Sequence, residues 1–439
     1  LNGWGNEMGY LLIFFICIII FIVFIRRDLT HPLIYFLIPW VLCLLTYVLD
    51  IYRINGQINQ EALNLVIIGT LSFILGTILI RKTLVGAFRI NNSGSAFPTT
   101  YRNWLIKLII VFSTVFNIML VVIMINYLRS GISYAYIRDL LYSYNDDGTK
   151  FFTSKLMLNV YNIVDVPMTY CVAQVAVIEL FHGRLKLQYK VMSWISIGAY
   201  IIATGGRLII MFMLFQFIFA MGYYRKDIPW KTIRRVGMFV LVLGIVAFVT
   251  TLFRVKSQSA GSLKINSVYA YFNVNLPILS RWIGTVDTSG VKGNGLAFFG
   301  GIFQLLDLIL NKFGINLPVY ENVANLINIP QQNWVQIYSG NWYNAFDTMF
   351  YDLYIDFRIW GVFIGSLILG RLSKWIYVLS TEFKNEKYVF PAMILVEILA
   401  SSFFRWQFGT FTFTGAFLLS FFMFKNLKSN ETNGSEDLR

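Results

Sequence analysis

Carboxylates inside apolar segments are the first residues of this sequence that raise a question of chemistry. Asp352 and Asp356 stand four residues apart in FYDLYIDFRIWG, so a helix would place both on one face. Asp165 lies in another apolar run, just before Pro167, whose ring removes a helix hydrogen bond and favours a kink. Charged groups are costly inside a membrane, so they normally face a protein interior, a cavity or each other. Each aspartate is a candidate for proton transfer, and a structural ion pair is the alternative.

Basic residues stand near acids in the same apolar runs. Arg358 follows Asp356 by half a turn, and Arg405 lies eight residues after Glu397, on the same side of a helix. These arginines either serve a functional site, form structural ion pairs, or snorkel from a helix end to the membrane interface.

The motif ATGGR at 203–207 joins two apolar runs and ends in Arg207. Its two glycines permit a reversal with positive φ and let another group approach the backbone closely. A helix starts next, and its N-terminal amides attract anions, while the arginine adds a planar fork of donors that matches a phosphate. The motif therefore predicts a phosphate or diphosphate site. Arg254, at the mouth of another apolar run on the same predicted face, strengthens this interpretation.

Motifs for several common reactions are missing from the sequence. It contains no GxxxxGK[ST], no HExxH and no GxSxG, so ATP hydrolysis, zinc proteolysis and serine hydrolysis have no support. The two histidines, His31 and His182, fall on loops predicted to be cytoplasmic, and the three cysteines show no metal-like spacing. We expect neither a metal nor a cofactor.

The composition indicates which elements must hold these residues. Of the 439 residues, 57% are apolar or aromatic and 13% are charged, whereas soluble domains hold about 25% charged residues. Runs such as LLIFFICIIIFIVFI at 11–25 approach the roughly 20 residues that cross a bilayer core of about 30 Å. The net charge of +14 comes from Lys and Arg at the ends of apolar runs, which is typical of membrane topology and not of nucleic-acid binding. The sequence therefore predicts an all-α polytopic membrane protein.

The apolar runs predict about eleven transmembrane helices. The connections after the first, third, fifth, seventh and ninth expected spans hold eighteen Lys or Arg, and the alternate short connections hold seven. Because basic residues concentrate on the cytoplasmic side, this predicts an external N-terminus and a cytoplasmic C-terminus. The expected organisation is a bundle of about eight spans over 1–253, an external loop over 254–347, about three spans over 348–424, and a polar tail over 425–439. The expected spans are 9–25, 33–49, 62–80, 104–126, 157–181, 191–204, 207–224, 236–253, 349–370, 388–404 and 407–424.

The long external loop is the part of the chain best suited to hold a site outside the membrane. Loops of this length are uncommon unless they are functional or disordered. Its content of tyrosine and tryptophan is unlike that of disordered segments, so we expect it to be ordered and to carry short helices. The apolar stretch 296–310 is too short to span comfortably and predicts an interfacial or re-entrant helix.

The layout and two motifs resemble a known family. A chain of about eleven spans, the ATGGR turn, a long external loop and then NAFDTMFYDLYIDFRIWG at 344–361 are similar to the bacterial oligosaccharide repeat-unit polymerases, the Wzy class. The resemblance covers most of the chain in layout and is specific at 203–210 and 344–361. Family members often have a glycine after the Asp-Phe of the second motif, where this chain has Arg358. The related O-antigen ligases use an external histidine, so the predicted topology favours a polymerase.

This resemblance implies a membrane glycosyltransferase of the GT-C-like type that uses neither a metal nor a nucleotide sugar. The donor would be a growing glycan on undecaprenyl diphosphate and the acceptor a lipid-linked repeat unit, at the outer face of the bacterial cytoplasmic membrane. Arg207 and Arg254 would stabilise the leaving diphosphate. A carboxylate, from Asp352, Asp356 or Asp165, would take the proton of the attacking hydroxyl.

Aromatic residues of the loop complete the implied site. Tyr269, Tyr271 and the loop tryptophans would stack on sugar rings, or they would form an aromatic belt at the membrane interface. The implied partners are lipid-linked oligosaccharides, membrane lipids, a flippase and a chain-length regulator, with no nucleic acid. The alternative function is a flippase or another polysaccharide transporter, against which the asymmetric loop and the absence of two matched halves argue.

Overall fold

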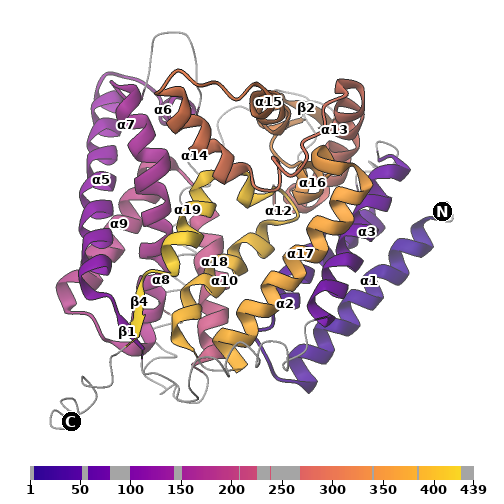
Figure 1. Ribbon diagram of the computed structural model, residues 1–439, viewed down its shortest axis with the longest axis horizontal. Coiled ribbons are helices and arrows are strands. Elements are labelled where there is room, and N and C mark those ends of the chain that lie inside the picture. The colour runs from indigo at the N-terminus through magenta and orange to yellow at the C-terminus, as the bar shows by residue number, and fades with distance from the viewer. Residues whose placement is uncertain are drawn as a thin grey trace. The chain divides into compact units, whose positions relative to one another are not determined.

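The computed structural model describes residues 4–51, 58–79, 99–142, 151–206, 208–224, 238, 267–338, 341–382 and 385–426. Over these residues the chain is almost entirely helical, with two short two-stranded antiparallel sheets (Figure 1). The all-α class predicted from the apolar runs is confirmed.

Six helices of the described part are long and apolar enough to cross a membrane. The predicted count of about eleven is not confirmed. The helices found within 207–224, 388–404 and 407–424 have only 16, 13 and 10 residues. The helix Leu187–Thr204, which covers the span expected at 191–204, has 18 residues but is not apolar enough to be a candidate. The span expected at 236–253 lies outside the described residues. The six candidates are Met8–Ile25, Pro32–Leu49, Gln60–Ile78, Asn103–Arg129, Lys155–Phe181 and Ile359–Glu382.

The chain divides into two compact units, each built from separated stretches. Unit 1 comprises Leu1–Asn92, Ser257–Glu382 and Leu395–Thr414, and unit 2 comprises Ser93–Lys256, Phe383–Ile394 and Gly415–Arg439. These two units are defined by contacts within the protein. The parts expected from the sequence were defined by which residues would lie inside the membrane, and that division stays a prediction.

Unit 1 contains the first three helices of the chain and most of the elements after residue 266. Helix α2 begins at Pro32, where the preceding His31 caps it by accepting the amide of Leu33, and α3 begins after Asn59, which accepts the amide of Ala62. The elements are α1 (Trp4–Ile20), η1 (Phe21–Ile25), α2 (Pro32–Leu49), α3 (Gln60–Ile78), α12 (Ser267–Asn273), α13 (Asn275–Ser289), α14 (Gly300–Asn311), α15 (Pro318–Gln332), β2 (Val335–Tyr338), β3 (Asn341–Tyr343), α16 (Thr348–Phe357), α17 (Ile359–Tyr377), η5 (Val378–Glu382) and η7 (Gln407–Gly409).

Two glycines let α3 and α17 pack closely side by side, an arrangement visible in Figure 1. A Cβ atom at Gly76 would lie 2.3 Å from the carbonyl oxygen of Leu367, and one at Gly370 would lie 2.3 Å from that of Phe73. Small residues allow such close backbone contact between membrane helices. Further into the unit, Trp40 stacks on Phe350 at 5.0 Å between ring centroids.

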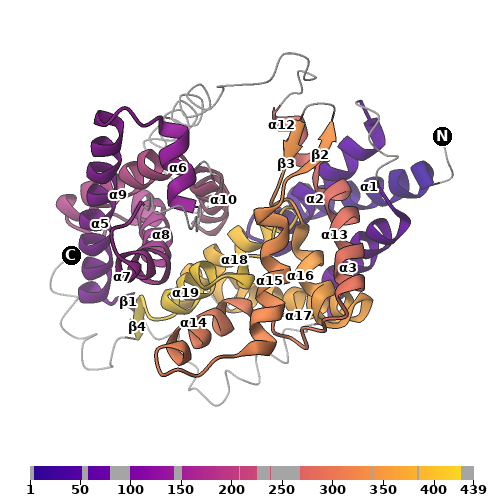
Figure 2. The same ribbon diagram turned by 90° about the horizontal axis from the view of Figure 1, so that it is seen from above.

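The loop expected at 254–347 carries short helices and a hairpin in its described part. Figure 2 shows the β2–β3 hairpin standing beside α12 and α13. These elements share a small core of Ala270, Val274, Ile278 and Ile337. The apolar stretch 296–310 forms α14, a helix of 12 residues, and its interfacial position stays a prediction.

The span expected at 349–370 is broken and the prediction of one continuous helix there is wrong. Arg358 has φ 55° and ψ −136°, so α16 ends at Phe357 and α17 starts at Ile359 in a new direction. The absence of a Cβ at Gly361 allows the tight return, since a Cβ there would lie 2.0 Å from the carbonyl oxygen of Leu353.

Unit 2 is a helical bundle in which α5, α8 and α9 pack against one another. Strand β1 pairs with β4 antiparallel, with Thr100 opposite Lys425. Helices α18 (Val389–Ser401) and α19 (Phe411–Ser420) contribute residues to both units. The other elements of unit 2 are β1 (Thr99–Tyr101), α5 (Asn103–Arg129), α6 (Tyr134–Tyr142), α7 (Lys155–Val160), η3 (Tyr161–Asp165), α8 (Val166–His182), α9 (Leu187–Thr204), α10 (Leu208–Tyr223), η6 (Glu386–Tyr388) and β4 (Phe424–Asn426).

The contact between α3 and α17 leads to a stability prediction. Gly370→Ala places a methyl group against the backbone of Phe73, and overpacking of this kind costs about 1–3 kcal/mol of unfolding free energy. We expect a lower unfolding temperature in detergent. Gly9→Ala is the matched control, because no atom lies within 4 Å of a Cβ at that position. Equal unfolding temperatures for the two variants would contradict the close packing.

Candidate functional site

Asp347 and Asp352 are buried carboxyl groups of unit 1, near Arg405. They are 1% and 2% exposed, and the Oδ1 atom of each accepts no hydrogen bond within the described part of the chain. Burial raises the pKa of Asp347 to about 7, although the nearby positive charge of Arg405 acts in the opposite direction. A carboxyl group with a pKa near neutrality exchanges its proton easily, which suits acid–base chemistry.

The backbone around Asp347 is held in an uncommon conformation. Ala345 and Thr348 have φ values of 60° and 64°, which non-glycine residues adopt only at a cost. Hydrogen bonds hold the backbone at and next to these two residues. The amide of Ala345 donates to the carbonyl oxygen of Pro330, and the amide of Met349 donates to that of Ser402, each at 2.8 Å. The motif at 344–361 includes this segment, but Asp347 itself was not singled out, because the strain beside it depends on contacts with distant residues.

Asp356 holds a turn of the chain in place. Its Oδ1 accepts the amide of Ala297 at 3.0 Å, and its Oδ2 accepts that of Phe298 at 2.8 Å. Gly293 makes this approach possible, since a Cβ there would lie 2.3 Å from Asp356 Oδ1. The two carboxylate oxygens thus anchor the turn that leads into α14, so Asp356 has a positioning role that its spacing from Asp352 did not predict.

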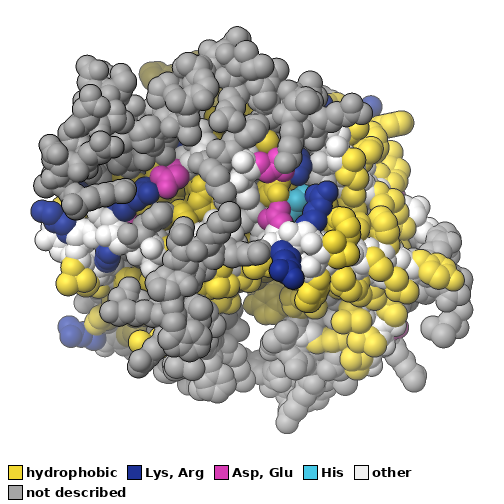
Figure 3. All heavy atoms as spheres, turned by 90° about the horizontal axis from the view of Figure 1, so that it is seen from below, with side chains coloured by type: hydrophobic (Ala, Val, Ile, Leu, Met, Phe, Trp, Pro, Cys, Tyr) yellow, Lys and Arg dark blue, Asp and Glu magenta, His cyan; other side chains and the backbone are white. Residues whose placement is uncertain are grey.

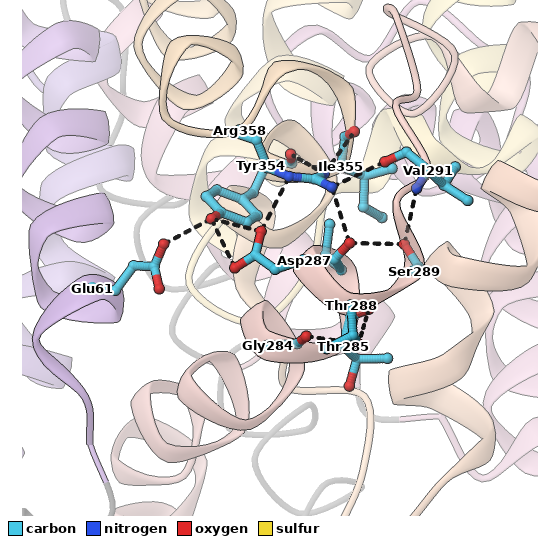
Figure 4. Close-up of polar contacts among 11 residues, drawn as sticks. Glu61, Gly284, Thr285, Asp287, Thr288, Ser289, Val291, Tyr354, Ile355 and Arg358 are labelled. Atoms are coloured by element: carbon cyan, nitrogen blue, oxygen red, sulfur yellow. Dashed lines mark hydrogen bonds and ion pairs between the residues drawn. The ribbon is translucent and has the colours of Figure 1, made fainter.

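Arg358 joins α16 to the end of α13 (Figure 4). Its Nη2 donates to the carbonyl oxygens of Val286 and Val291 at 3.0 and 3.1 Å, and its Nε pairs with Asp287 at 3.1 Å. Its φ of 55° with ψ −136° belongs to a region that glycine adopts readily. The position thus has a backbone conformation that favours glycine, while its side chain makes the contacts of an arginine.

Tyr354 lies between two exposed carboxylates, Glu61 and Asp287, as Figure 4 shows. Its hydroxyl is 2.7 Å from Glu61 Oε1 and 3.1 Å from Asp287 Oδ1. A single hydroxyl proton goes to one acceptor at a time, and the shorter distance favours Glu61. The negative charge of Asp287 is paired with the guanidinium of Arg358. Oε2 of Glu61, in contrast, accepts no hydrogen bond from a described residue.

Glu61 and Asp287 were not among the residues that the sequence singled out. Tyr354 and Glu61 are separated by 293 positions, so no local spacing connects them. The only available sign was Asn59 followed by an acid, which is typical of a helix start and carries no functional meaning.

A cavity of about 860 Å³ opens in unit 1. Glu61 and Asp287 do not line it, but Asn59 and Thr285, each two positions from one of these acids, do. Its wall includes the indole rings of Trp282, Trp334 and Trp342, of which the last two are 60% and 55% exposed. Polar groups stand among them: Arg281, Asn333 and Gln336, with Asn59 and Ser280. The amide of Asn59 donates to Ser280 Oγ at 3.1 Å, so the start of α3 is attached to α13 at the cavity.

The cavity, Glu61 and Asp287 share the same two helices. Asn59 and Glu61 are neighbours at the start of α3, and Asp287 follows Ser280 by seven residues on α13. Seven residues are close to two helical turns, or about 10 Å of rise along one face. Together they combine flat aromatic surfaces, hydrogen-bonding groups and carboxylates, which suits a ligand that has hydroxyl groups.

The two tyrosines expected to bind sugars lie elsewhere in unit 1. The hydroxyl of Tyr269 donates to Thr46 O at 3.0 Å and accepts the amide of Ile51 at 3.2 Å, so it fastens α12 to the end of α2. Tyr271 is 41% exposed and packs edge-on against Phe346. Neither tyrosine lines the tryptophan cavity, and their sugar contacts stay a prediction.

Asp165 belongs to unit 2, at the end of the π-helical turn η3. It is fully buried, and neither carboxylate oxygen accepts a hydrogen bond from the described residues. In the same unit Asn117 donates to Thr169 Oγ1 at 2.9 Å and to Ser196 Oγ at 3.0 Å, which links three helices through polar groups.

The diphosphate residues predicted from the sequence, Arg207 and Arg254, lie outside the described residues. Among the residues that are described, no group of three His, Cys, Asp or Glu side chains is placed to hold a metal ion.

Comparison with known proteins gives no relative. No protein-family model matches this chain, and no curated protein or solved structure is similar to it at a significant level.

The raised pKa of Asp347 leads to a prediction about pH. An unfolded aspartate has a pKa of about 3.8 and the folded one about 7, so the folded state binds the extra proton. This contribution to stability is present at low pH and is lost as pH rises through about 7. We expect Asp347→Asn, which is neutral at every pH, to lose less stability than the wild type when the pH is raised from about 5 to 8.

The measurement is the unfolding temperature in detergent across this pH range. Glu321→Gln, at an exposed acid in the first turn of α15, is the control for the loss of any one negative charge. Parallel curves for Asp347→Asn and the wild type would show that Asp347 is charged in the folded protein throughout.

Proposed function

We propose that this protein is a membrane glycosyltransferase that polymerises undecaprenyl-diphosphate-linked oligosaccharide repeat units into a surface polysaccharide. The observation that carries the proposal is the tryptophan-lined cavity, whose lining residues Asn59 and Thr285 lie two positions from Glu61 and Asp287. The described part of the chain also has six candidate membrane spans. The family resemblance of the motifs at 203–210 and 344–361 points to the same function. A GT-C-like architecture and an outer-face site in a bacterial cytoplasmic membrane are part of this proposal, as is an external N-terminus with a cytoplasmic C-terminus.

The chemistry of the cavity wall supports a carbohydrate ligand. A pyranose ring has an apolar face that packs on an indole ring and an edge of hydroxyl groups that needs donors and acceptors. Trp334 and Trp342 offer the first kind of contact, and Asn333 and Gln336 offer the second. The volume of about 860 Å³ falls within the range of about 300–1,000 Å³ that is usual for ligand cavities.

The proposed reaction is a glycosyl transfer. An acceptor hydroxyl oxygen forms a bond to the anomeric carbon of the donor glycan, and the bond from that carbon to the diphosphate oxygen breaks. Undecaprenyl diphosphate leaves with the bonding electron pair, and the hydroxyl proton passes to a carboxylate. Diphosphate is a good leaving group, so the protein mainly orients the substrates and stabilises charge.

Two sets of residues take these roles in the proposal. Arg207 and Arg254 stabilise the departing diphosphate, as the ATGGR motif indicates. Glu61 takes the proton, because it is exposed and one of its oxygens has no described hydrogen-bond donor. Asp352 and Asp165 remain candidates for proton transfer, while Asp356 is occupied by backbone amides.

The direct test is the product of cells that lack the protein. Loss of a polymerase leaves single lipid-linked repeat units on the outer face of the membrane. Single units retained on the inner face would instead identify a flippase, and unchanged polymer would refute both functions.

The tryptophans of the cavity give the first substitution test. We expect Trp342→Ala to reduce polymer formation by roughly 5- to 30-fold, the ratio that corresponds to about 1–2 kcal/mol of lost aromatic contact. Trp342→Phe keeps a ring and should retain most of the activity. Polymer is measured on gels from cells with matched membrane levels of each variant.

Trp360 provides the matched control for this test. It is 66% exposed on α17 and does not line the cavity. Trp360→Ala should leave polymer formation unchanged. If both alanine variants lose activity equally, the effect is due to a general loss of exposed tryptophan and not to the cavity.

The two carboxylates beside Tyr354 give the second substitution test. Removal of a general base typically costs about 10²- to 10⁴-fold in rate, so Glu61→Gln should nearly abolish polymer formation. Asp287→Asn should have a much smaller effect, because Asp287 is paired with Arg358 and exposed ion pairs contribute little. Full polymer from the Glu61→Gln variant would exclude Glu61 as the base.

A further inference from the structure

A second cavity of unit 1 lies between α1 on one side and α3 and α17 on the other. Its volume is about 580 Å³. Most of its wall is apolar, from Phe14, Ile18, Ile22, Ile74 and Ile78. Cys17 and Thr77 also line it.

One end of this cavity is polar and carries two cations, Arg26 and Lys374. His31 and the acid Glu382 line the same end. Figure 3 shows basic, acidic and histidine side chains gathered beside a wide hydrophobic area on this face of the molecule. A long apolar wall with cations at one end matches an acyl chain joined to an anionic headgroup.

The helix that forms the outer wall faces away from the protein over most of its surface. Only 22% of the apolar window Met8–Ile25 is buried within the protein. Ile13, Phe24 and Ile25 are 59%, 71% and 69% exposed. In a membrane such a surface contacts lipid, so lipid molecules are present at high concentration beside the cavity.

We propose that this cavity binds one anionic phospholipid, with an acyl chain against α1 and α3 and the headgroup phosphate at Arg26 and Lys374. This site is separate from the tryptophan cavity and does not depend on the proposed glycosyl transfer.

Arg26 is the principal phosphate ligand in this arrangement. Its guanidinium lies 5.5 Å from the ring of Phe21 and forms no ion pair with a described residue. The nearest acid in sequence, Asp28, is turned elsewhere: its carboxylate accepts the hydroxyl of Thr30 at 2.6 Å and also that of Tyr377. A guanidinium offers five donors in a planar fork, which matches two phosphate oxygens.

Lys374 and His31 add donors at the same end. Lys374 Nζ lies 3.7 Å from Glu382 Oε1 and 4.2 Å from the centre of the Tyr377 ring, so its positive charge is held at this end of the cavity. His31 accepts the amide of Leu33 through Nδ1 at 3.4 Å, and burial, with Lys374 beside it, lowers its pKa to about 3. The neutral ring therefore carries its proton on Nε2, a donor that suits a phosphate oxygen.

Cys17 makes the site measurable without a cysteine being introduced. It is exposed and lines the cavity, whereas the other two cysteines, Cys43 and Cys171, are buried. The full-length protein in neutral detergent is treated with a maleimide while phosphatidylglycerol or phosphatidylcholine is added at equal mole fractions. We expect phosphatidylglycerol to slow modification of Cys17 roughly tenfold relative to phosphatidylcholine, as one charge-assisted contact allows.

Two arginine variants test the headgroup contact. Arg26→Gln should abolish the difference between the two lipids, whereas Arg27→Gln, which removes an exposed arginine outside the cavity wall, should keep it. Equal modification of Arg26→Gln and wild type in phosphatidylcholine shows that the variant is folded.

Three outcomes would overturn the proposal. Equal protection by both lipids means that no anionic headgroup is recognised. Equal protection by inorganic phosphate alone means that the site takes a free anion instead of a lipid. If Arg26→Gln keeps the difference in modification rate between the two lipids, Arg26 is not the principal phosphate ligand. None of these results bears on polymer formation.

Discussion

The reversal of the chain at Arg358 is the constraint on which unit 1 depends. A non-glycine residue with φ 55° and ψ −136° is unfavourable by itself, so other contacts must hold it there. The guanidinium supplies them, since it binds the carbonyl oxygens of Val286 and Val291 and the carboxylate of Asp287. The same contacts fix the end of α13 next to α16, and the reversal sends α17 back against α3.

Two carboxylates of α16 show how position on one helix can lead to different chemistry. Asp352 and Asp356 share a face, as their spacing indicates, but they meet different surroundings. Asp356 is satisfied by two backbone amides of the turn before α14, whereas Asp352 keeps an oxygen without a partner among the described residues. A buried carboxylate with two amide donors is stabilised as a structural anchor, and one without them retains its capacity to exchange a proton.

The sequence predicted what depends on composition and local spacing, and it missed what depends on distant contacts. Apolar runs gave the helical membrane class and the positions of α2, α3 and α5 within a few residues. They could not show that 349–370 breaks, because the break is stabilised by Val286 and Val291, far away in sequence. The count of about eleven spans is not confirmed for a related reason. Helix α18 is apolar and buried within the protein, and hydropathy alone does not distinguish such a helix from a membrane span.

The candidate site shows the same difference between what composition predicts and what depends on distant contacts. The aromatic loop was expected to be ordered and to hold sugars, and its tryptophans do line a cavity. The sequence could not predict which aromatic residues line the cavity. Tyr269, for example, is held at the end of α2 by hydrogen bonds that no sequence spacing indicates. Glu61 and Asp287 were overlooked for lying in ordinary polar surroundings, although they meet at Tyr354.

The pairing of β1 with β4 has a consequence for how the protein is made. It joins Thr99 to Asn426, so unit 2 closes only after nearly the whole chain has been synthesised. Both units are built from separated stretches: unit 1 requires residues up to Thr414, and unit 2 requires residues beyond it. The early helices are therefore synthesised before several of the segments that they contact in the folded protein. Contacts between such distant parts of a chain form slowly. The two units therefore become complete at different stages of synthesis, unit 1 before unit 2.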